Sequence, residues 1–351
     1  MTTFHILTQY IWPDAAPTGL YAEHLATRLH ERGYDVRLVG GNGSYRTLVR
    51  EKPAVPILRL DHYHGRRASL VQTFFEYASV KHAFENYIAR FVRSGDVVIA
   101  TSAPPNTVQL ADCIKRRRAR AIYWLQDYYP ELIRGIRDYP ASIRSPFRRW
   151  WDSQLSRWDK VVKISANLGG SVSNATVIRN WPTILFESAA APESKTALYL
   201  GNLGYGHDVD LLVRACEQLR DEGYKIDIHA DGRGIQRLPA WLKAKPPCQG
   251  VAESREALLR HEVHLIAAHP KLRQAIFPSK IWNSIALDRR LVCTGFAGEM
   301  STELDATKRA PFNTHLDQWV DLISKMAVSP LTELAAKSRE SISDLRPAAI
   351  A

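Results

Sequence analysis

Short apolar runs alternate with amphipathic segments along the first half of the chain. Buried strands are predicted where apolar residues run together between turn residues, at residues 4–10, 36–39, 96–100 and 121–125. Between the first two, Leu20, Leu25 and Leu29 recur at helical spacing, and Gly33 supplies a helix-ending signal. Residues 106–120 predict a further helix that ends in a basic run. Strands that alternate with helices in this way indicate a parallel sheet with helices on both faces.

The second half of the chain repeats this order. Strands are predicted at residues 196–200, 225–230, 263–267 and 291–294, and helices at residues 209–219 and 281–286. We therefore expect an α/β protein with two domains, whose carboxyl strand ends share a cleft. A linker predicted around Trp181 and at residues 189–192 divides the chain into domains at residues 1–180 and 181–335. Residues 336–351 are expected to form a tail that packs back on the first domain.

Composition narrows the classes of protein. The chain has 351 residues, and no apolar run reaches the ~18 residues that a membrane-spanning helix needs. The start of the chain lacks the basic and apolar regions of a signal peptide, so we expect a cytoplasmic protein. The four cysteines form no Cys-x-x-Cys pair, which disfavours a zinc site or a disulfide framework.

Charge is distributed unevenly along the chain. Residues 1–170 contain 25 Lys and Arg against 15 Asp and Glu, whereas residues 171–351 contain 22 against 21. An excess confined to one half indicates an anionic partner: nucleic acid, an anionic membrane or a phosphorylated substrate. An ordinary solvated surface is the alternative. The basic run at residues 115–118 has no nucleic-acid-binding module beside it, so specific nucleic-acid binding is not expected.

Two segments are candidates for binding phosphate groups. Gly201, Gly204 and Gly206 follow a predicted strand and precede a helix, where backbone N–H groups and the helix dipole favour a diphosphate. An ordinary left-handed turn would explain the same glycines. Lys280 and Asn283 fall on one face of a predicted helix, which suits a phosphate and a ribose hydroxyl. A solvated helix start is the alternative there.

One carboxylate is a candidate for the reacting centre. Asp127 follows the predicted strand at residues 121–125, and the carboxyl end of a parallel strand faces the cleft. It would act as a base or stabilise positive charge, unless it only caps the next helix. His261, His264 and His269 are not expected to bind a metal, because strand positions three apart point to opposite faces.

Several loose segments between Tyr10 and Glu299 occur in an order typical of a known family. They are residues 10–19 (Y-x-x-P-x-x-x-x-T-G), 101–105 (T-S-A-P-P), 126–131 (Q-D-Y-Y-P-E), 177–181 (V-I-R-N-W), 201–204 (G-N-L-G), 207–208 (H-D), 278–280 (P-S-K) and 298–299 (G-E). Together they resemble the family 4 glycosyltransferases. The similarity is closest to the branch that builds bacterial O-antigen, capsule and colanic acid, with its fucosaminyltransferase-like members.

This resemblance implies the GT-B fold, in which two Rossmann-like domains face each other across a cleft. The first domain would bind the acceptor and the second the donor. It implies retaining transfer of a hexosyl or N-acetylhexosaminyl group from a nucleotide sugar, usually UDP-linked, to a glycan or polyprenyl-linked acceptor, without a metal or other cofactor. Asp127 and Glu131 are then the expected catalytic residues. The expected donor-binding residues are Thr18, Gly19, Asn202, Gly204, His207, Arg233, Val251, Ser279, Lys280 and Asn283.

The chain departs from the family pattern at the donor site. Asn202 and His207 stand where many members carry Arg and Lys, and Tyr205 where the closest branch usually has Arg. The two family glutamates align with Ala275 and Asn283. A protonated His207 would restore one cation, and Asn283 could still bind a ribose hydroxyl. Two other functions remain open: a non-catalytic GT-B protein that binds a partner or glycan, and another GT-B enzyme such as a nucleotide-sugar epimerase.

A tryptophan-rich segment suggests where the protein works. Phe147, Trp151, Leu155 and Trp158 share one helical face. The neighbouring Arg148, Arg149 and Trp150 complete the pattern of a helix that lies at a membrane surface, against an anionic leaflet or a lipid-linked acceptor. The protein would then be peripheral on the inner face of the cell membrane. Ordinary core packing of the tryptophan face is the alternative.

Overall fold

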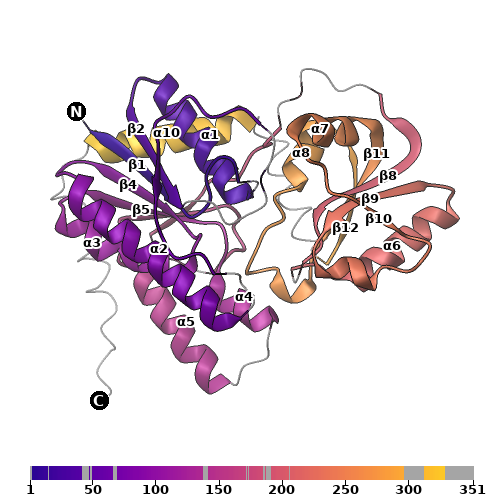
Figure 1. Ribbon diagram of the computed structural model, residues 1–351, viewed down its shortest axis with the longest axis horizontal. Helices are drawn as coiled ribbons and strands as arrows, with labels where there is room; N and C mark the ends of the chain where they lie inside the picture. Colours follow the sequence, from indigo (N-terminus) through magenta and orange to yellow (C-terminus); the bar gives the residue numbers. More distant parts are fainter. Residues whose placement is uncertain are drawn as a thin grey trace, which may run out of the picture.

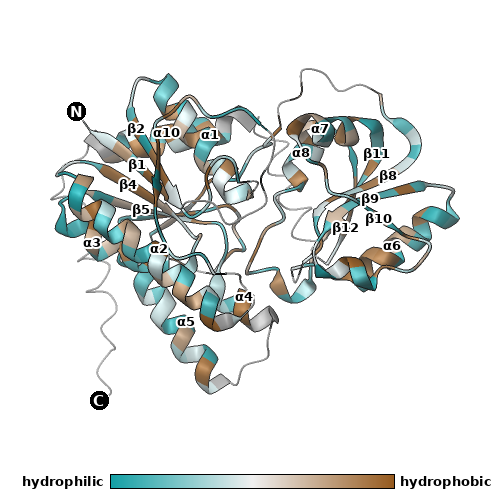
Figure 2. Ribbon diagram, in the orientation of Figure 1, coloured by the Kyte–Doolittle hydropathy of each residue, from teal (hydrophilic) through white to brown (hydrophobic). Residues whose placement is uncertain are grey.

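The protein is described by a computed structural model that covers residues 2–14, 16–41, 47, 50–65, 69–136, 141–170, 172, 174–184, 186, 191–204, 206–295 and 312–328. It contains two parallel sheets, each covered by helices and lying side by side (Figure 1). The hydrophobic residues concentrate on the strands, and most helices show one polar and one apolar side (Figure 2). This is the α/β architecture that the alternation of strands and helices predicts.

The first sheet has seven strands in the order β3-β2-β1-β4-β5-β6-β7, and all of its neighbours are parallel. Its strands are β1 (Thr3–Thr8), β2 (Asp35–Gly41), β3 (Ile57–Leu60), β4 (Val97–Thr101), β5 (Arg120–Leu125), β6 (Lys160–Lys163) and β7 (Ala175–Val177). Its helices are α1 (Pro17–Glu31), α2 (Leu70–Phe91), the 3₁₀ helix η1 (Pro105–Leu110), α3 (Ala111–Arg116), α4 (Tyr129–Ile136) and α5 (Ala141–Leu155). The strand order reverses between β1 and β4, and ligands bind α/β sheets at such a point.

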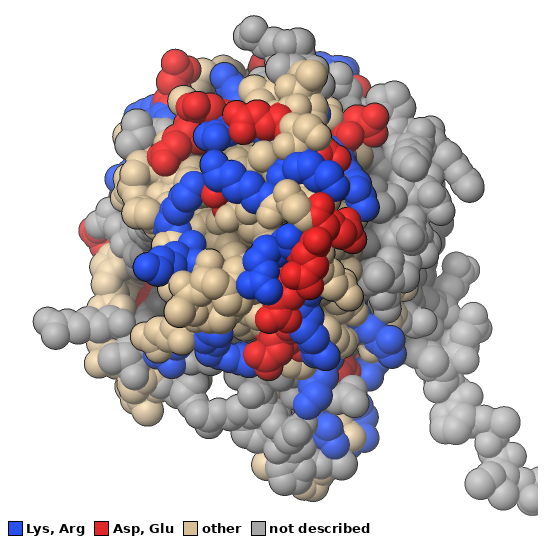
Figure 3. Space-filling view, turned by 90° about the vertical axis from the view of Figure 1, so that its right-hand side faces the viewer, with Lys and Arg blue, Asp and Glu red and all other residues tan. Residues whose placement is uncertain are grey.

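The second sheet has five parallel strands in the order β10-β9-β8-β11-β12. They are β8 (Glu193–Asn202), β9 (Lys225–Asp231), β10 (Ala244–Lys245), β11 (His261–Ala267) and β12 (Arg290–Thr294). The helices are α6 (Val209–Asp221), η2 (Arg233–Arg237), α7 (Val251–Arg260), η3 (Pro270–Leu272) and α8 (Ile281–Ala286). On the face that this domain presents, basic and acidic side chains are intermixed (Figure 3), in agreement with the balanced charge of the second half.

The last described helix, α10 (Phe312–Val328), returns to the first domain, although we expected residues 181–335 to belong to the second. The Trp319 ring lies 4.6 Å from that of Trp124 on β5. Asp317 accepts hydrogen bonds from Arg28 of α1 and from Arg32, which directly follows that helix, at 3.1 and 3.0 Å. The order of elements along the chain could not reveal this, because packing depends on which apolar face is left uncovered. The predicted tail at residues 336–351 lies outside the described residues.

The two domains also share a core. Ala275, Phe277 and Trp282 of the second domain belong to the same buried cluster as the apolar residues of the first sheet. Backbone hydrogen bonds cross between the domains, from Tyr128 N–H to the Ala275 carbonyl at 2.7 Å and from Gly169 N–H to the Gln274 carbonyl at 3.0 Å. The segment that precedes α8 is therefore fixed against the first domain.

The tryptophan face predicted to lie at a membrane is part of the protein core. Trp151, Leu155 and Trp158 are at most 2% exposed, and the indole N–H of Trp158 donates to the Val108 carbonyl. Phe147 packs against the same core, and the Trp158 ring lies 4.9 Å from that of Tyr123 on β5, so the apolar side of this segment packs toward the first sheet. Trp150 remains 40% exposed. Within the described residues, no helix combines the length and the hydropathy that crossing a membrane requires.

Candidate functional site

A cleft of about 760 Å³ opens between the two domains, within the size range of ligand pockets. The first domain lines it with one side of α1, residues 50–54 and Asp127. The second domain contributes the carboxyl end of β8, Asp231 at the end of β9, and the first turns of α7 and α8. The cleft therefore lies at the carboxyl ends of the strands, as the tandem α/β order predicts.

Lys280 is the central cation on the second-domain side of the cleft. Its Nζ donates to the Tyr199 hydroxyl at 2.8 Å and to the Asn202 carbonyl at 3.3 Å, and lies 4.0 Å from the centre of the Tyr199 ring. Burial lowers the pKa of Lys280 to about 7, and Asp231 opposes this shift. An ammonium has three donors, so one remains for a ligand once these two bonds are made. A lysine with a pKa near 7 is only partly protonated at neutral pH, and a bound anion would stabilise its protonated form.

Gly201 makes room for that lysine. Its φ of +122° is a conformation that other residues rarely adopt, and a Cβ at this position would lie 2.8 Å from Lys280 Cε. The glycine that the sequence suggested as a phosphate-binding turn thus allows the lysine side chain to cross the end of β8. Gly204 and Gly206 also line the cleft.

His207 lines the cleft as a neutral side chain. Burial, followed by the charge of Lys280, lowers its pKa to about 3. Its Nδ1 accepts a hydrogen bond from the Gly204 N–H at 3.2 Å. Burial and the neighbouring Lys280 therefore oppose the protonation on which a replacement cation at His207 depends. The adjacent Asp208 caps α6, accepting from the Leu211 N–H.

Asn283 also lines the cleft, but its amide holds the crossover between the domains. Its Oδ1 accepts from the backbone N–H groups of Thr183 and Ile184 at 2.9 and 3.2 Å, and its Nδ2 donates to Thr183 Oγ1 at 3.3 Å. Both lone pairs of Oδ1 are engaged in this arrangement, which leaves one Nδ2–H for the ribose contact expected for Asn283. The sequence could not indicate this, because the bonds join positions 100 residues apart.

Asp127 faces the same cleft from the first domain. The Ser102 hydroxyl oxygen accepts from the backbone N–H groups of Gln126 and Asp127, at 3.1 and 3.0 Å, which fixes the turn after β5. Burial raises the pKa of Asp127 to about 6, so the side chain ionises close to neutral pH. Its negative charge also helps to raise the pKa of Tyr129. The position and pKa suit a base or a group that stabilises positive charge.

The remaining predicted site residues lie in different places. Asn202, Val251 and Ser279 line the cleft, whereas Thr18, Gly19, Glu131 and Arg233 are not among its lining residues. Gly19 lets α1 approach the Tyr10 backbone, where a Cβ would be 2.4 Å from the Tyr10 carbonyl oxygen.

The predicted residues on α4 and α5 lie away from the cleft. Glu131 is buried and accepts a 3.2 Å hydrogen bond from Arg148 of α5. Arg149 is exposed on that helix, outside the cleft. Tyr205 and residues 298–299 lie outside the described residues.

Sequence reasoning missed the residues that the first domain contributes beside α1. Glu23 is 2% exposed and forms an ion pair with Arg50, whose second nitrogen donates to it at 2.9 Å. Arg50 also donates to the Asp14 carbonyl at 3.1 Å. Lys52 lies further along the same lining segment. No local pattern indicates this pair, since its members are 27 positions apart. The signal available in the sequence was Glu23 itself, a charged residue on the apolar face of α1.

These features define the class of protein. The chain has the GT-B fold: two Rossmann-like, parallel-sheet domains that face each other across a ligand-sized cleft. Over 98% of its length it is similar to sucrose-phosphate synthase from Thermosynechococcus elongatus, all of which is covered, with a TM-score of 0.60 at 11% identity. TarM of S. aureus, solved in complex with UDP, aligns with 98% of this chain and 97% of its own, with a TM-score of 0.59 at 8% identity.

A sequence relative points in the same direction. The chain is 24% identical over 343 aligned positions to the putative colanic acid biosynthesis glycosyl transferase WcaI of Escherichia coli strain K12. The alignment covers 83% of this chain and 82% of that protein. No protein-family model matches the chain.

Proposed function

We propose that this protein is a glycosyltransferase that moves a sugar from a nucleotide donor to an acceptor in the synthesis of a bacterial surface polysaccharide or glycolipid. The observation that carries the proposal is the pairing of Lys280 and Asp127 in one cleft, at the strand ends of two Rossmann-like domains. Breaking an anomeric bond creates negative charge on the departing diphosphate and positive charge on the sugar. The cleft offers a cation on one side and a carboxylate on the other. The similarity to WcaI supports the biological setting.

The donor side suits a diphosphate held without a metal ion. The free N–H of Lys280 and the first turn of α7 would bind the phosphate oxygens. We propose UDP as the nucleotide and retention of configuration, in the manner of the family that the sequence resembles. The acceptor hydroxyl would attack from the face of the departing diphosphate, which takes its proton. Turnover that is equal with and without added Mg²⁺ or Mn²⁺ would support this arrangement.

The acceptor is proposed to be a glycan or a lipid-linked sugar at the inner face of the cell membrane. The basic excess lies in the first 170 residues, and Ile143, Arg149 and Trp150 are each exposed on α5. We expect salt-sensitive sedimentation with liposomes that contain anionic lipid. Replacing Arg149 and Trp150 with Ala should weaken it, whereas Trp241→Ala, at a similarly exposed tryptophan of the second domain, should not. Wild-type protein that stays in the supernatant at low salt would point to a soluble acceptor.

The transferase itself is tested by product analysis. The purified chain is first screened for thermal stabilisation by a panel of nucleotide sugars, since a ligand at 100 times its Kd adds about 2.7 kcal/mol. The donors that stabilise it are then incubated with glycan and polyprenyl-diphosphate-linked acceptors, and products are identified by mass. A new glycoside supports the proposal, and an isomerised donor without a glycoside would instead indicate an epimerase.

A non-catalytic role is the second candidate, because the donor side carries little charge. Within the described residues, Lys280 is the one Lys or Arg that the second domain contributes to the cleft lining. His207 is neutral and Asn283 is engaged by the crossover. If the protein binds a nucleotide sugar or glycan yet forms no product and hydrolyses no donor, the binding role replaces the enzymatic one.

A further inference from the structure

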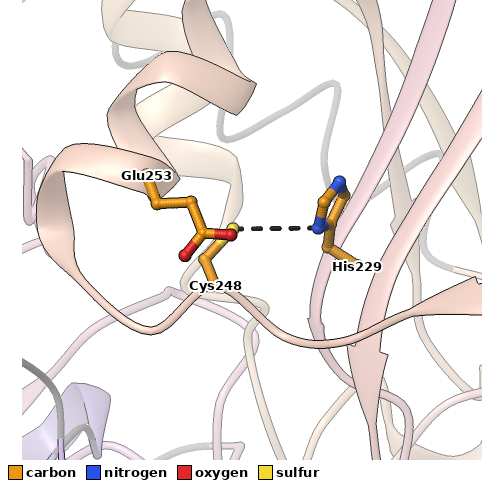
Figure 4. Close-up of side chains that lie close together, drawn as sticks. All are labelled: His229, Cys248 and Glu253. Atoms are coloured by element: carbon orange, nitrogen blue, oxygen red, sulfur yellow. Dashed lines mark hydrogen bonds between the residues drawn. The ribbon is translucent and has the colours of Figure 1, made fainter.

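Outside the cleft, three side chains with metal-binding atoms converge on one point. His229 comes from β9, Cys248 from the loop that follows β10, and Glu253 from the first turn of α7 (Figure 4). One ligand atom from each lies within 4.8 Å of the other two, and Cys248 Sγ is 3.9 Å from His229 Nδ1. Among the described residues, no other group of three or more His, Cys, Asp or Glu side chains has its potential ligand atoms this close together.

We propose that His229, Cys248 and Glu253 bind a zinc ion. Thiolate, imidazole and carboxylate together form a donor set suited to Zn²⁺, whereas Mg²⁺ and Ca²⁺ take oxygen ligands. With Zn–S near 2.3 Å and Zn–N near 2.0–2.1 Å at a tetrahedral angle, sulfur and nitrogen would be separated by about 3.6 Å. The observed 3.9 Å is therefore close to the separation that a shared ion requires.

The surroundings favour a site with one open position. Cys248 is 2% exposed, His229 is half-buried and Glu253 is exposed, so the ion would lie at the edge of the protein with water as its fourth ligand. The Gln249 N–H donates to Glu253 Oε2 at 2.7 Å, which holds the carboxylate beside the loop. On binding, Cys248 releases its thiol proton to solvent. His229 Nδ1 lies 3.2 Å from the Pro246 carbonyl, a contact that needs a proton on Nδ1, so His229 must also change tautomer: solvent takes the Nδ1 proton, Nε2 gains one, and the Nδ1 lone pair binds the metal in place of that hydrogen bond.

Zinc here would connect the edge of the second sheet to the helix that borders the cleft. Val251 and Ser254, on the same first turns of α7 as Glu253, line the cleft. An ion that joins α7 to β9 would therefore fix the wall of the ligand site without touching the ligand. The cysteine spacing gave no indication of this site, because its members come from three elements and include a single cysteine. The inference does not depend on the proposed transferase activity.

The test measures metal binding directly on the full-length chain with any affinity tag removed. We expect one equivalent of Zn²⁺ in competition with a chromophoric chelator, and a rise in melting temperature on adding Zn²⁺. Replacing zinc with Co²⁺ should produce a thiolate-to-cobalt charge-transfer absorption. Removing a residue that only orients a metal ligand lowers metal affinity roughly 10–100-fold. Cys248→Ser and His229→Ala change the proposed ligands themselves, so each should weaken Zn²⁺ binding by roughly 100-fold.

Matched controls separate this site from other histidines and cysteines. Cys113→Ser, in the first domain, and Glu256→Gln, at an exposed position of α7, should bind Zn²⁺ like the wild type. The metal-free melting temperature of each variant shows whether it folds. Should Cys248→Ser lose folding, Glu253→Gln provides the second ligand variant. Zinc binding that is unchanged in the ligand variants, or a cobalt spectrum without the thiolate band, would overturn the proposal.

Discussion

Lys280 makes the binding of an anion depend on pH at the level of a single side chain. Its pKa is lowered to about 7, and a bound diphosphate raises it, so protonation and binding favour each other. We expect the affinity for UDP to fall as pH rises from about 6 to about 8, as Lys280 loses its proton. Lys280→Met should weaken binding at low pH by about 1.5–3 kcal/mol, the contribution of a hydrogen bond to a charged group.

Calorimetric titration at several pH values gives this measurement. UDP itself ionises near pH ~6, so the informative quantity is the difference between wild type and Lys280→Met at each pH. The exposed Lys271 provides a control, Lys271→Met, which should follow the wild-type curve. Equal affinities for the wild type and the Lys280 variant would remove this lysine from the donor site.

Asp127 should control turnover rather than donor binding. Its pKa is raised to about 6 by burial, so the ionised form that can stabilise positive charge is present above that pH. We expect kcat to fall on the acid side with an apparent pKa near 6. Asp127→Asn should reduce kcat by roughly 10²-fold and abolish that limb, with UDP affinity almost unchanged. Steady-state kinetics across pH test this, with Asp112→Asn on α3 as the control; full turnover by Asp127→Asn would exclude the role.

At the scale of elements, α8 is connected to the crossover by Asn283. Asn283→Ala would leave the backbone N–H groups of Thr183 and Ile184 without their acceptor, at a cost of about 1–3 kcal/mol. Asn283→Asp keeps the acceptor oxygen and should lose less. Urea unfolding of both variants measures the difference. The two variants being equally stable would show that these hydrogen bonds contribute little.

The elements were predictable where one face of a strand or helix is buried in a simple pattern. The strands β1, β2, β4, β5, β8, β9, β11 and β12 and the helices α1, α6 and α8 all fall on predicted segments. The helix α2 was missed although it spans 22 residues. Val71, Phe74 and Phe75 are exposed on it while Glu76 is buried, so its apolar positions do not mark the packed side.

The site was predictable only as far as its backbone determines it. Asp127 and Lys280 follow directly from strand and helix ends, and both line the cleft. Asn283 and His207 were assigned ligand roles from their positions. The hydrogen bonds of Asn283 go to a distant segment, and the pKa of His207 is lowered by its burial and then by the charge of Lys280. The ion pair of Glu23 and Arg50 depends on how α1 meets a loop, which no local pattern encodes.

At the scale of the whole molecule, α10 stabilises the first domain although it follows the second in the chain. Trp319 is fully buried against Trp124, and the Tyr34 hydroxyl lies 2.7 Å from Ser324 Oγ. Trp319→Ala should reduce the free energy of unfolding by about 3–5 kcal/mol, because it leaves a large cavity between α10 and the sheet. The exposed neighbour Gln318 gives the control, Gln318→Ala, which should cost little. Chemical denaturation measures both variants, and equal midpoints would show that α10 is dispensable.

The return of α10 also sets the order of events while the chain is being synthesised. The first sheet is complete once Val177 has emerged from the ribosome, but the helix that covers Trp124 ends at Val328. At ~5–20 residues per second, the roughly 150 residues between them take about 8–30 s to make. During that interval the apolar face beside β5 meets water, or a chaperone, instead of α10. A stop codon late in the gene would therefore damage the domain that was translated first.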